Sequence, residues 1–366
     1  MAMPLKDQSP PLRFYAGERA LARLREHGLR PEDVSVIAGA AGGPKALGLV
    51  GLDEALFGDW LPRAPRERHL IGASIGSWRS ASLCLPDPVA GIRRLSELYT
   101  QQRFPKGISM AEVSRKCEAM LSDLLQDQDE HVLTQSQFRL NVVVNASRWR
   151  SLQADTHPAL ALGLAGVIAA NTVNRRFVAN GFERIIVHDP RDTPPLGDSE
   201  DLPTRYAMLT PENLRATLLA SGSIPTVMEA VNEIPGVPGR AFRDGGLTDY
   251  HLDLPYQTDG IVLFPHFRER IVPGWFDKLL PWRGGDPERL ADLLLVAPSH
   301  EYLAELPDGQ LPDRKDFVRY SGDDETRERH WHRAMQESRR LGEYFLEQVD
   351  RERFVDEVRP LSELRG

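Results

Sequence analysis

Cysteine is scarce in this sequence of 366 residues, which contains only Cys84 and Cys117. Two cysteines, with no C-x-x-C pair and no histidine cluster at ligand spacing, provide neither a disulfide framework nor a zinc signature. We therefore expect two free thiols in a reducing compartment, no metal and no cofactor.

Long hydrophobic runs and an excess of basic residues are also lacking. The longest apolar run, residues 159–170, is far shorter than the roughly 20 residues of a membrane-spanning helix, and it predicts a buried helix. The first 20 residues lack the apolar core of a signal peptide and contain several prolines. The formal net charge of −8 argues against a nucleic-acid partner. We expect a cytoplasmic protein.

Apolar runs typical of strands alternate with helical patterns along the chain. Strands are predicted at residues 34–39, 69–72, 139–145, 184–188, 240–243, 260–264 and 292–297, and helices at residues 46–57, 75–85, 109–126, 158–177 and 211–219. Continuous apolar strands suit a parallel sheet that is covered on both faces. The alternation therefore predicts an α/β fold, a three-layer α/β/α sandwich with a mostly parallel central sheet.

The ends of the chain lack this alternation. We expect an N-terminal extension at residues 1–30, a catalytic domain at residues 31–300 and a helical C-terminal extension at residues 301–366 that packs on the same domain. In the C-terminal extension, the residues with helical spacing that are expected to face inward are Trp331, Met335, Leu341 and Phe345.

A first candidate site is the motif GASIG at residues 72–76. It follows a predicted strand and opens a predicted helix, which is the context that a nucleophilic serine requires. Gly72 and Gly76 would allow the strand and the helix to pack closely around a tight turn at Ser74. A glycine-bounded turn without catalytic function has the same pattern, so this motif alone is weak.

A second candidate site is the motif GAAGGPK at residues 39–45. Small residues between a strand and a helix expose backbone N–H groups that can bind an anion. The anion could be a nucleotide phosphate or the oxyanion of acyl transfer, and a turn without ligand is the third reading. The phosphate-loop pattern fails because Ala46 follows Lys45, and the dinucleotide pattern G-x-G-x-x-G is absent.

The third candidate site is the motif FRDGG at residues 242–246. Asp244 follows a short predicted strand, and Gly245 and Gly246 would let the loop bring its carboxylate close to another group. An aspartate in a tight turn is an equally common explanation of such a segment.

Together, these motifs resemble the patatin-like phospholipase family, which has a glycine-rich loop, a G-x-S-x-G serine and a D-G-[GA] aspartate in this order. The segment ASGSIPT at residues 220–226 resembles the stretch that precedes the aspartate in that family, so the resemblance covers about residues 34–250. It implies that Ser74 is the nucleophile and Asp244 its base. It also implies an oxyanion hole formed by Gly42, Gly43 and Lys45. The sequence departs from the family pattern at Ala41, Pro44 and Ala46.

The resemblance predicts a lipid acyl hydrolase that cleaves carboxylic esters through an acyl-enzyme on Ser74. The alternatives are an acyl- or anion-binding module of the same fold without turnover, and a nucleotide-binding protein that uses the Gly42–Gly43 loop. A serine–histidine triad is a further competitor, with candidate histidines at His251, His266 and His300. The triad fold would place more strands before the serine than this sequence has.

An aromatic and basic segment suggests a second partner besides a lipid or other ester substrate. The segment contains Trp275, Phe276, Leu279, Leu280 and Trp282 together with Arg268, Arg270, Lys278 and Arg283. Aromatic and basic side chains together are typical of membrane interfaces. Peripheral contact with a membrane surface is therefore a hypothesis, and a loop packed on the core is the alternative.

Overall fold

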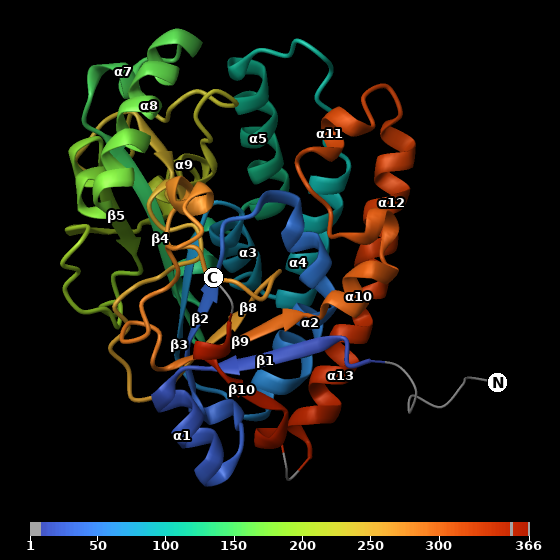
Figure 1. Cartoon of the computed structure of the whole chain (residues 1–366). Coiled ribbons are helices and arrows are strands. Elements are labelled where there is room, and N and C mark those ends of the chain that lie inside the picture. The colour runs from blue at the N-terminus through green and yellow to red at the C-terminus, as the bar shows by residue number, and fades with distance from the viewer. Residues whose placement is uncertain (1–8, 352–353, 365–366) are drawn as a thin grey trace.

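One mixed sheet runs through the molecule. The computed structural model describes residues 9–351 and 354–364, and its strand order is β10-β1-β9-β8-β2-β3-β4-β5-β6, with β7 paired to β4 (Figure 1). The strands are β1 (Leu12–Ala16), β2 (Val34–Gly39), β3 (Arg68–Ala73), β4 (Phe138–Ser147), β5 (Phe182–His188), β6 (Thr204–Met208), β7 (Phe242–Asp244), β8 (Ile261–Pro265), β9 (Leu293–Pro298) and β10 (Val358–Pro360). Most neighbours are parallel, which confirms the predicted α/β class with a mostly parallel sheet.

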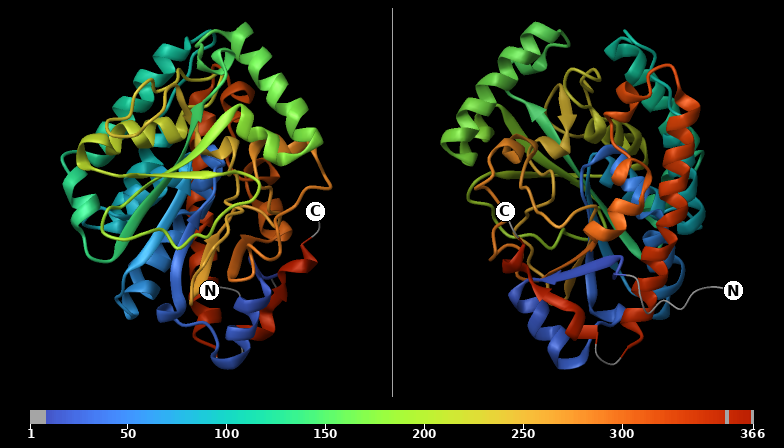
Figure 2. Two further views of the ribbon diagram at one scale, coloured as in Figure 1. Left: turned by 90° about the vertical axis from the view of Figure 1, so that its left-hand side faces the viewer. Right: turned by 45° about the vertical axis from the view of Figure 1, so that its right-hand side comes forward.

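Helices surround this sheet unevenly. The α-helices are α1 (Glu18–His27), α2 (Val50–Ala55), α3 (Ile75–Leu83), α4 (Pro88–Thr100), α5 (Met110–Leu125), α6 (Asp129–Thr134), α7 (Arg150–Gln153), α8 (His157–Val173), α9 (Pro211–Gly222), α10 (His300–Glu305), α11 (Asp316–Arg319), α12 (Asp324–Glu337) and α13 (Arg339–Val349). Helix α3 packs on β2, β3 and β4, and α9 packs on β4 and β7. In the left view of Figure 2, connecting segments rather than long helices cross much of the sheet face turned to the viewer.

The direction of β5 differs from the prediction, because its apolar run suggested a strand parallel to its neighbours. β5 is antiparallel to β4, with Val143 opposite Ile186. Every residue of β4 is buried, and so are the apolar residues of β5. Burial on both faces produces a continuous apolar run whichever way the strand points, so the pattern predicts burial but not direction.

The segment after the glycine-rich loop also differs from its prediction as one helix at residues 46–57. It forms a 3₁₀ helix η3 (Gly43–Leu49), then α2, then a π-helical turn at Leu56–Trp60. Close packing on the C-terminal helices explains part of this irregularity. A Cβ at Gly51 would lie 2.4 Å from the backbone of Ser338, and α2 contacts α13.

The two chain ends take part in the sheet. β1 pairs with β9 in antiparallel and with β10 in parallel orientation, so the segments expected as extensions each add a strand. Within those segments, residues 1–8, 352–353 and 365–366 lie outside the described part. Trp331, Leu341 and Phe345 are buried as predicted, whereas Met335 is only half buried.

The longest apolar run forms α8, but its burial prediction is wrong for half of the helix. Leu160 and Val167 are buried, whereas Leu162 and Ile168 are exposed on the opposite side. No helix in the described ranges combines the length and the apolar character that a bilayer crossing requires.

Candidate active site

Ser74 occupies a strained turn between β3 and α3. Its backbone has φ 56° and ψ −130°, a conformation that costs a non-glycine residue roughly 1–3 kcal/mol. The Ser74 N–H donates a hydrogen bond of 2.9 Å to Ser221 Oγ. The surrounding glycines permit the turn, since a Cβ at Gly76 would lie 1.9 Å from the Gly39 carbonyl oxygen and one at Gly72 would lie 2.5 Å from the nitrogen of Ser77. The turn thus projects the serine from the sheet.

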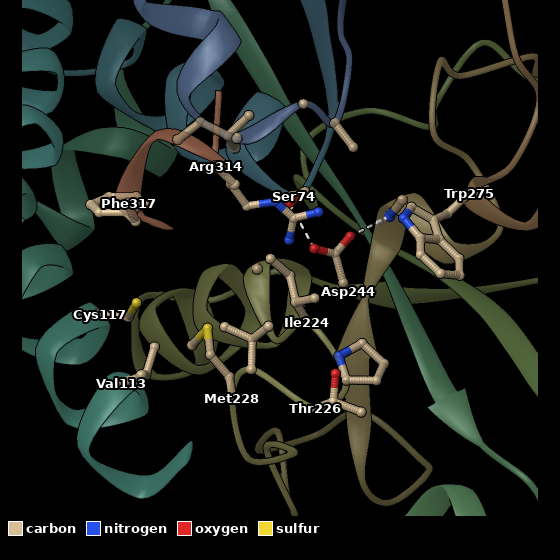
Figure 3. A pocket seen from close by; sticks show the side chains of 18 of the residues that line it. Ser74, Val113, Cys117, Ile224, Thr226, Met228, Asp244, Trp275, Arg314 and Phe317 are labelled. Carbon is tan, nitrogen blue, oxygen red and sulfur yellow. Dashed lines mark hydrogen bonds between the residues drawn. The ribbon is translucent and has the colours of Figure 1, made fainter. Parts of the chain in front are cut away.

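The Asp244 carboxylate accepts a hydrogen bond from the Ser74 hydroxyl. Ser74 Oγ donates to Asp244 Oδ2 at 2.7 Å, and the Gly246 N–H donates to Asp244 Oδ1 at 2.7 Å (Figure 3). The pairing of β7 with β4 sets this position, with Asp244 opposite Val144. Gly245 is required next to it, because a Cβ there would lie 2.1 Å from the Val143 carbonyl oxygen. The structure therefore brings together the two residues that the resemblance pairs.

Burial makes Asp244 a stronger base than an exposed aspartate. Desolvation raises the pKa of Asp244 to about 6, while the hydrogen bonds from Ser74 and Gly246 and the positive charges of Arg314 and Lys278 act in the opposite direction. A carboxylate with this pKa is mostly ionised at neutral pH and still accepts a proton more readily than a group that titrates near 4.

The glycine-rich loop presents two free backbone donors at the serine. Within residues 9–351 and 354–364, the N–H groups of Gly42 and Gly43 donate to no protein acceptor, and both residues line the same cavity as Ser74. Gly43 has φ +59°, which favours glycine. Pro44 has no N–H to offer.

Lys45 lies elsewhere than its assignment to the oxyanion hole requires. Its ammonium forms an ion pair with Asp313, and Lys45 is absent from the cavity lining. Burial lowers the pKa of Lys45, whereas the hydrogen bond with Asp313 acts to raise it. The Lys45 ammonium, which was expected to face the substrate, is therefore paired with Asp313.

Arg314, which the sequence analysis missed, is a cation that the structure places beside the glycine-rich loop. Its side chain packs over Gly43, where a Cβ would lie 3.2 Å from Arg314 Cγ, and Figure 3 shows its guanidinium beside Ser74 and Asp244. No carboxylate of the described chain forms an ion pair with Arg314. No local motif marks this residue, because it lies far from the glycine-rich loop in sequence.

A second cation, Lys278, approaches the site from the connection after β8. Its ammonium lies 3.6 Å from the centre of the Tyr250 ring. Burial, together with the neighbouring charges of Arg314, Lys45 and Arg268, lowers the pKa of Lys278 to about 7. The sequence analysis had grouped Lys278 with a membrane-facing segment, whereas the structure packs it against Tyr250, a residue of the cavity wall.

The dyad opens into a cavity of about 570 Å³. Its walls come mainly from apolar side chains of α5, α11 and the segment after α9, with Leu164 from α8 and Trp275 from the connection after β8. Those that Figure 3 labels are Val113, Cys117, Ile224, Met228, Trp275 and Phe317. A cavity of this size is in the range of small-molecule sites, and its lining suits an acyl chain.

The candidate histidines of a triad lie apart from this cavity. The rings of His251 and His266 pack against each other with centroids 4.3 Å apart, and His300 begins α10. None of them lines the cavity with Ser74. Burial lowers the pKa of His266 to about 3 and that of His251 well below its usual value. The titratable side chain that is hydrogen-bonded to Ser74 is therefore Asp244 rather than a histidine.

The aromatic segment proposed for membrane contact is divided between core and surface. Phe276 and Leu280 are buried, whereas Trp275, Leu279 and Trp282 are exposed. Arg283 is hydrogen-bonded to Asp277 and Asn171. In the described ranges, no three histidine, cysteine, aspartate or glutamate side chains are grouped so as to hold a metal ion.

Comparison with known proteins adds little to this geometry. No family model matches the sequence, and no curated protein matches it either. Among solved structures, the crystal structure of VipD from Legionella pneumophila is similar, with a TM-score of 0.31 and 11% sequence identity. The match covers 92% of this chain and 71% of the VipD chain. Likeness at this level carries no argument about function.

Proposed function

We propose that this protein is a serine acyl hydrolase of the patatin-like type that cleaves carboxylic esters of lipids with a Ser74–Asp244 dyad. The observation that carries the proposal is the 2.7 Å hydrogen bond from the strained Ser74 to the buried carboxylate of Asp244. The apolar cavity beside the dyad supports an acyl substrate.

The proposed reaction has two steps. Ser74 Oγ attacks the ester carbonyl carbon while its proton passes to Asp244, which then delivers that proton to the leaving alkoxide. Asp244 next takes a proton from water, the hydroxide oxygen attacks the acyl-enzyme, and the proton returns to Ser74 as the carboxylic acid departs. The N–H groups of Gly42 and Gly43 provide donors for the oxyanion in both steps.

Arg314 completes the oxyanion site in this proposal, because Lys45 is engaged by Asp313. We expect Arg314→Gln to lower kcat for a neutral ester about 10- to 100-fold, since it removes a charged donor that acts on the transition state. The pKa of the acidic limb of kcat/KM should also rise, because Arg314 lowers the pKa of Asp244. Steady-state kinetics over a pH series would measure both effects.

The matched control is Arg329→Gln, an exposed arginine of α12 that is hydrogen-bonded to Thr326. This variant should keep the wild-type kcat and pH profile. Unchanged kcat and an unchanged acidic limb in Arg314→Gln would show that Arg314 does not contribute to the reaction. Loss of kcat in both variants would point to a general effect of charge.

The test of the proposed function itself is covalent labelling by a fluorophosphonate, followed by peptide mapping, together with a screen of p-nitrophenyl esters and phospholipids. We expect one labelled site, at Ser74, and ester turnover. Folded protein that is neither labelled nor active would instead support a binding module without turnover. Thermal stabilisation by a nucleotide, without ester hydrolysis, would favour the nucleotide-binding alternative.

A further inference from the structure

Helix α8 has a composition that is unusual for a helix at a protein surface. Residues 158–174 contain no aspartate, glutamate, lysine or arginine. A helix that is apolar all round is normally buried in a protein core or in a membrane, whereas a surface helix has a charged outer face. The uncharged composition of α8 at the surface therefore needs an explanation.

Only one side of α8 is buried. That side packs on its neighbours through Leu160, Gly163, Val167 and Asn171. The opposite side forms one continuous stripe of exposed residues, which we call the α8 face: Ala161, Leu162, Ala165, Ile168, Ala169, Thr172 and Val173. Among its large apolar side chains, Leu162 is 73% and Val173 is 75% exposed. Thr172 is the one polar member of this stripe.

The α8 face continues toward the mouth of the candidate active site. The 3₁₀ helix η8 (Trp275–Leu279) packs against α8 and adds the exposed side chains of Trp275 and Leu279. Trp275 also lines the cavity, as does Leu164 of α8. Val318 of α11 also lines the cavity and is 79% exposed. Helix α11 lies across the molecule from α8 (Figure 1).

The charges around the α8 face are basic. Arg150 precedes the helix and Arg176 follows it, and both are exposed. Neither forms an ion pair with a carboxylate in the described part of the chain. The nearby Asp155 is neutralised by Arg243, at 2.7 Å. An apolar stripe between unpaired arginines complements the apolar interior and negative surface of an anionic bilayer, whereas a second copy would bring like charges together.

We propose that the α8 face lies in the interfacial region of an anionic lipid bilayer and docks the protein with its cavity mouth at the membrane. The docking is independent of catalysis. Its consequence, that an acyl chain enters the cavity from the bilayer without crossing water, rests on the proposed function.

The test is cosedimentation of the full chain carrying Ser74→Ala with vesicles of phosphatidylcholine and phosphatidylglycerol, so that no lipid is consumed. Adding Leu162→Glu and Val173→Glu should weaken binding about tenfold or more, because exposed apolar area is replaced by negative charge. Adding Arg150→Gln and Arg176→Gln instead should weaken binding to these vesicles several-fold, with little effect on pure phosphatidylcholine vesicles.

Met208→Glu is the matched control, since it also replaces an exposed apolar side chain but lies at the end of β6 next to His188, away from the site. It should bind like the parent. Circular dichroism and Tm would show that every variant is folded. Equal vesicle binding by the parent and by the variant with Leu162→Glu and Val173→Glu would overturn the proposal. It would also be overturned if the parent bound no vesicles but formed a dimer that these two substitutions dissociate. Neither outcome depends on ester turnover, which is measured separately with the wild-type protein.

Discussion

Ser74→Ala is expected to lower kcat for ester hydrolysis at least about a thousand-fold, because it removes the atom that forms the acyl-enzyme. The fold should tolerate the change. The strained backbone of residue 74 is held by the Ser221 hydroxyl and by the close approach of β2, β3 and α3, none of which needs the Ser74 side chain. Hydrolysis of a p-nitrophenyl ester and fluorophosphonate labelling would measure the loss.

A suitable control for Ser74→Ala is Ser80→Ala. Ser80 is also a buried serine and lies in the second half of α3, but its hydroxyl donates to the Gly76 carbonyl and is not part of the cavity lining. The control should be labelled and should hydrolyse esters at nearly the wild-type rate. Turnover that survives in a folded Ser74→Ala variant would exclude Ser74 as the nucleophile, whatever the other groups in the cavity do.

The second large effect is expected from Asp244→Asn. The amide cannot accept the serine proton, so kcat should fall about a thousand-fold or more while the fold is preserved. In the wild type, kcat/KM should rise with pH through a midpoint near pH 6 and level off above about pH 7, because Asp244 is active only when it is ionised. A pH–rate profile would show this limb, and a flat profile from pH 5 to pH 8 would contradict Asp244 as the base.

Asp244→Asn should lower activity but increase the stability of the fold at neutral pH. Burial raises the pKa of Asp244 from 3.8 to about 6, so the folded state binds this proton more tightly than the unfolded state. Below about pH 3 both states are protonated and no penalty exists. As pH rises to about 7, ionised Asp244 destabilises the wild-type fold by about 2–3 kcal/mol relative to Asp244→Asn.

Urea unfolding of both proteins at about pH 4.5 and about pH 7.5 would measure this difference. The free energy of unfolding of Asp244→Asn should increase relative to that of the wild type as the pH rises. An activity loss combined with a stability gain at neutral pH is typical of a residue placed for function. A stability difference that does not change with pH would show that Asp244 titrates normally.

The sequence by itself determined the local features of this protein. Apolar runs located the strands that carry the site, and small residues between strand and helix located the turns at Gly42 and Ser74. These features follow from contacts between near neighbours, which a short stretch of sequence reports directly. The pairing of Ser74 with Asp244, 170 residues apart, came from the resemblance of several motifs in order and not from any one pattern.

Tertiary structure decided which charges reach the serine. Asp313 engages Lys45 from 268 residues away, and the neighbouring Arg314 occupies the space over Gly43 instead. It also decided that α8 exposes one apolar side and that β5 is antiparallel to β4. Hydrophobic pattern reports how much a segment prefers burial, but strand direction, the partner of a charge and the covering of a helix depend on how distant segments pack. That is why the sequence pointed to the turn at Ser74 but not to Arg314, the cation that the structure places beside it.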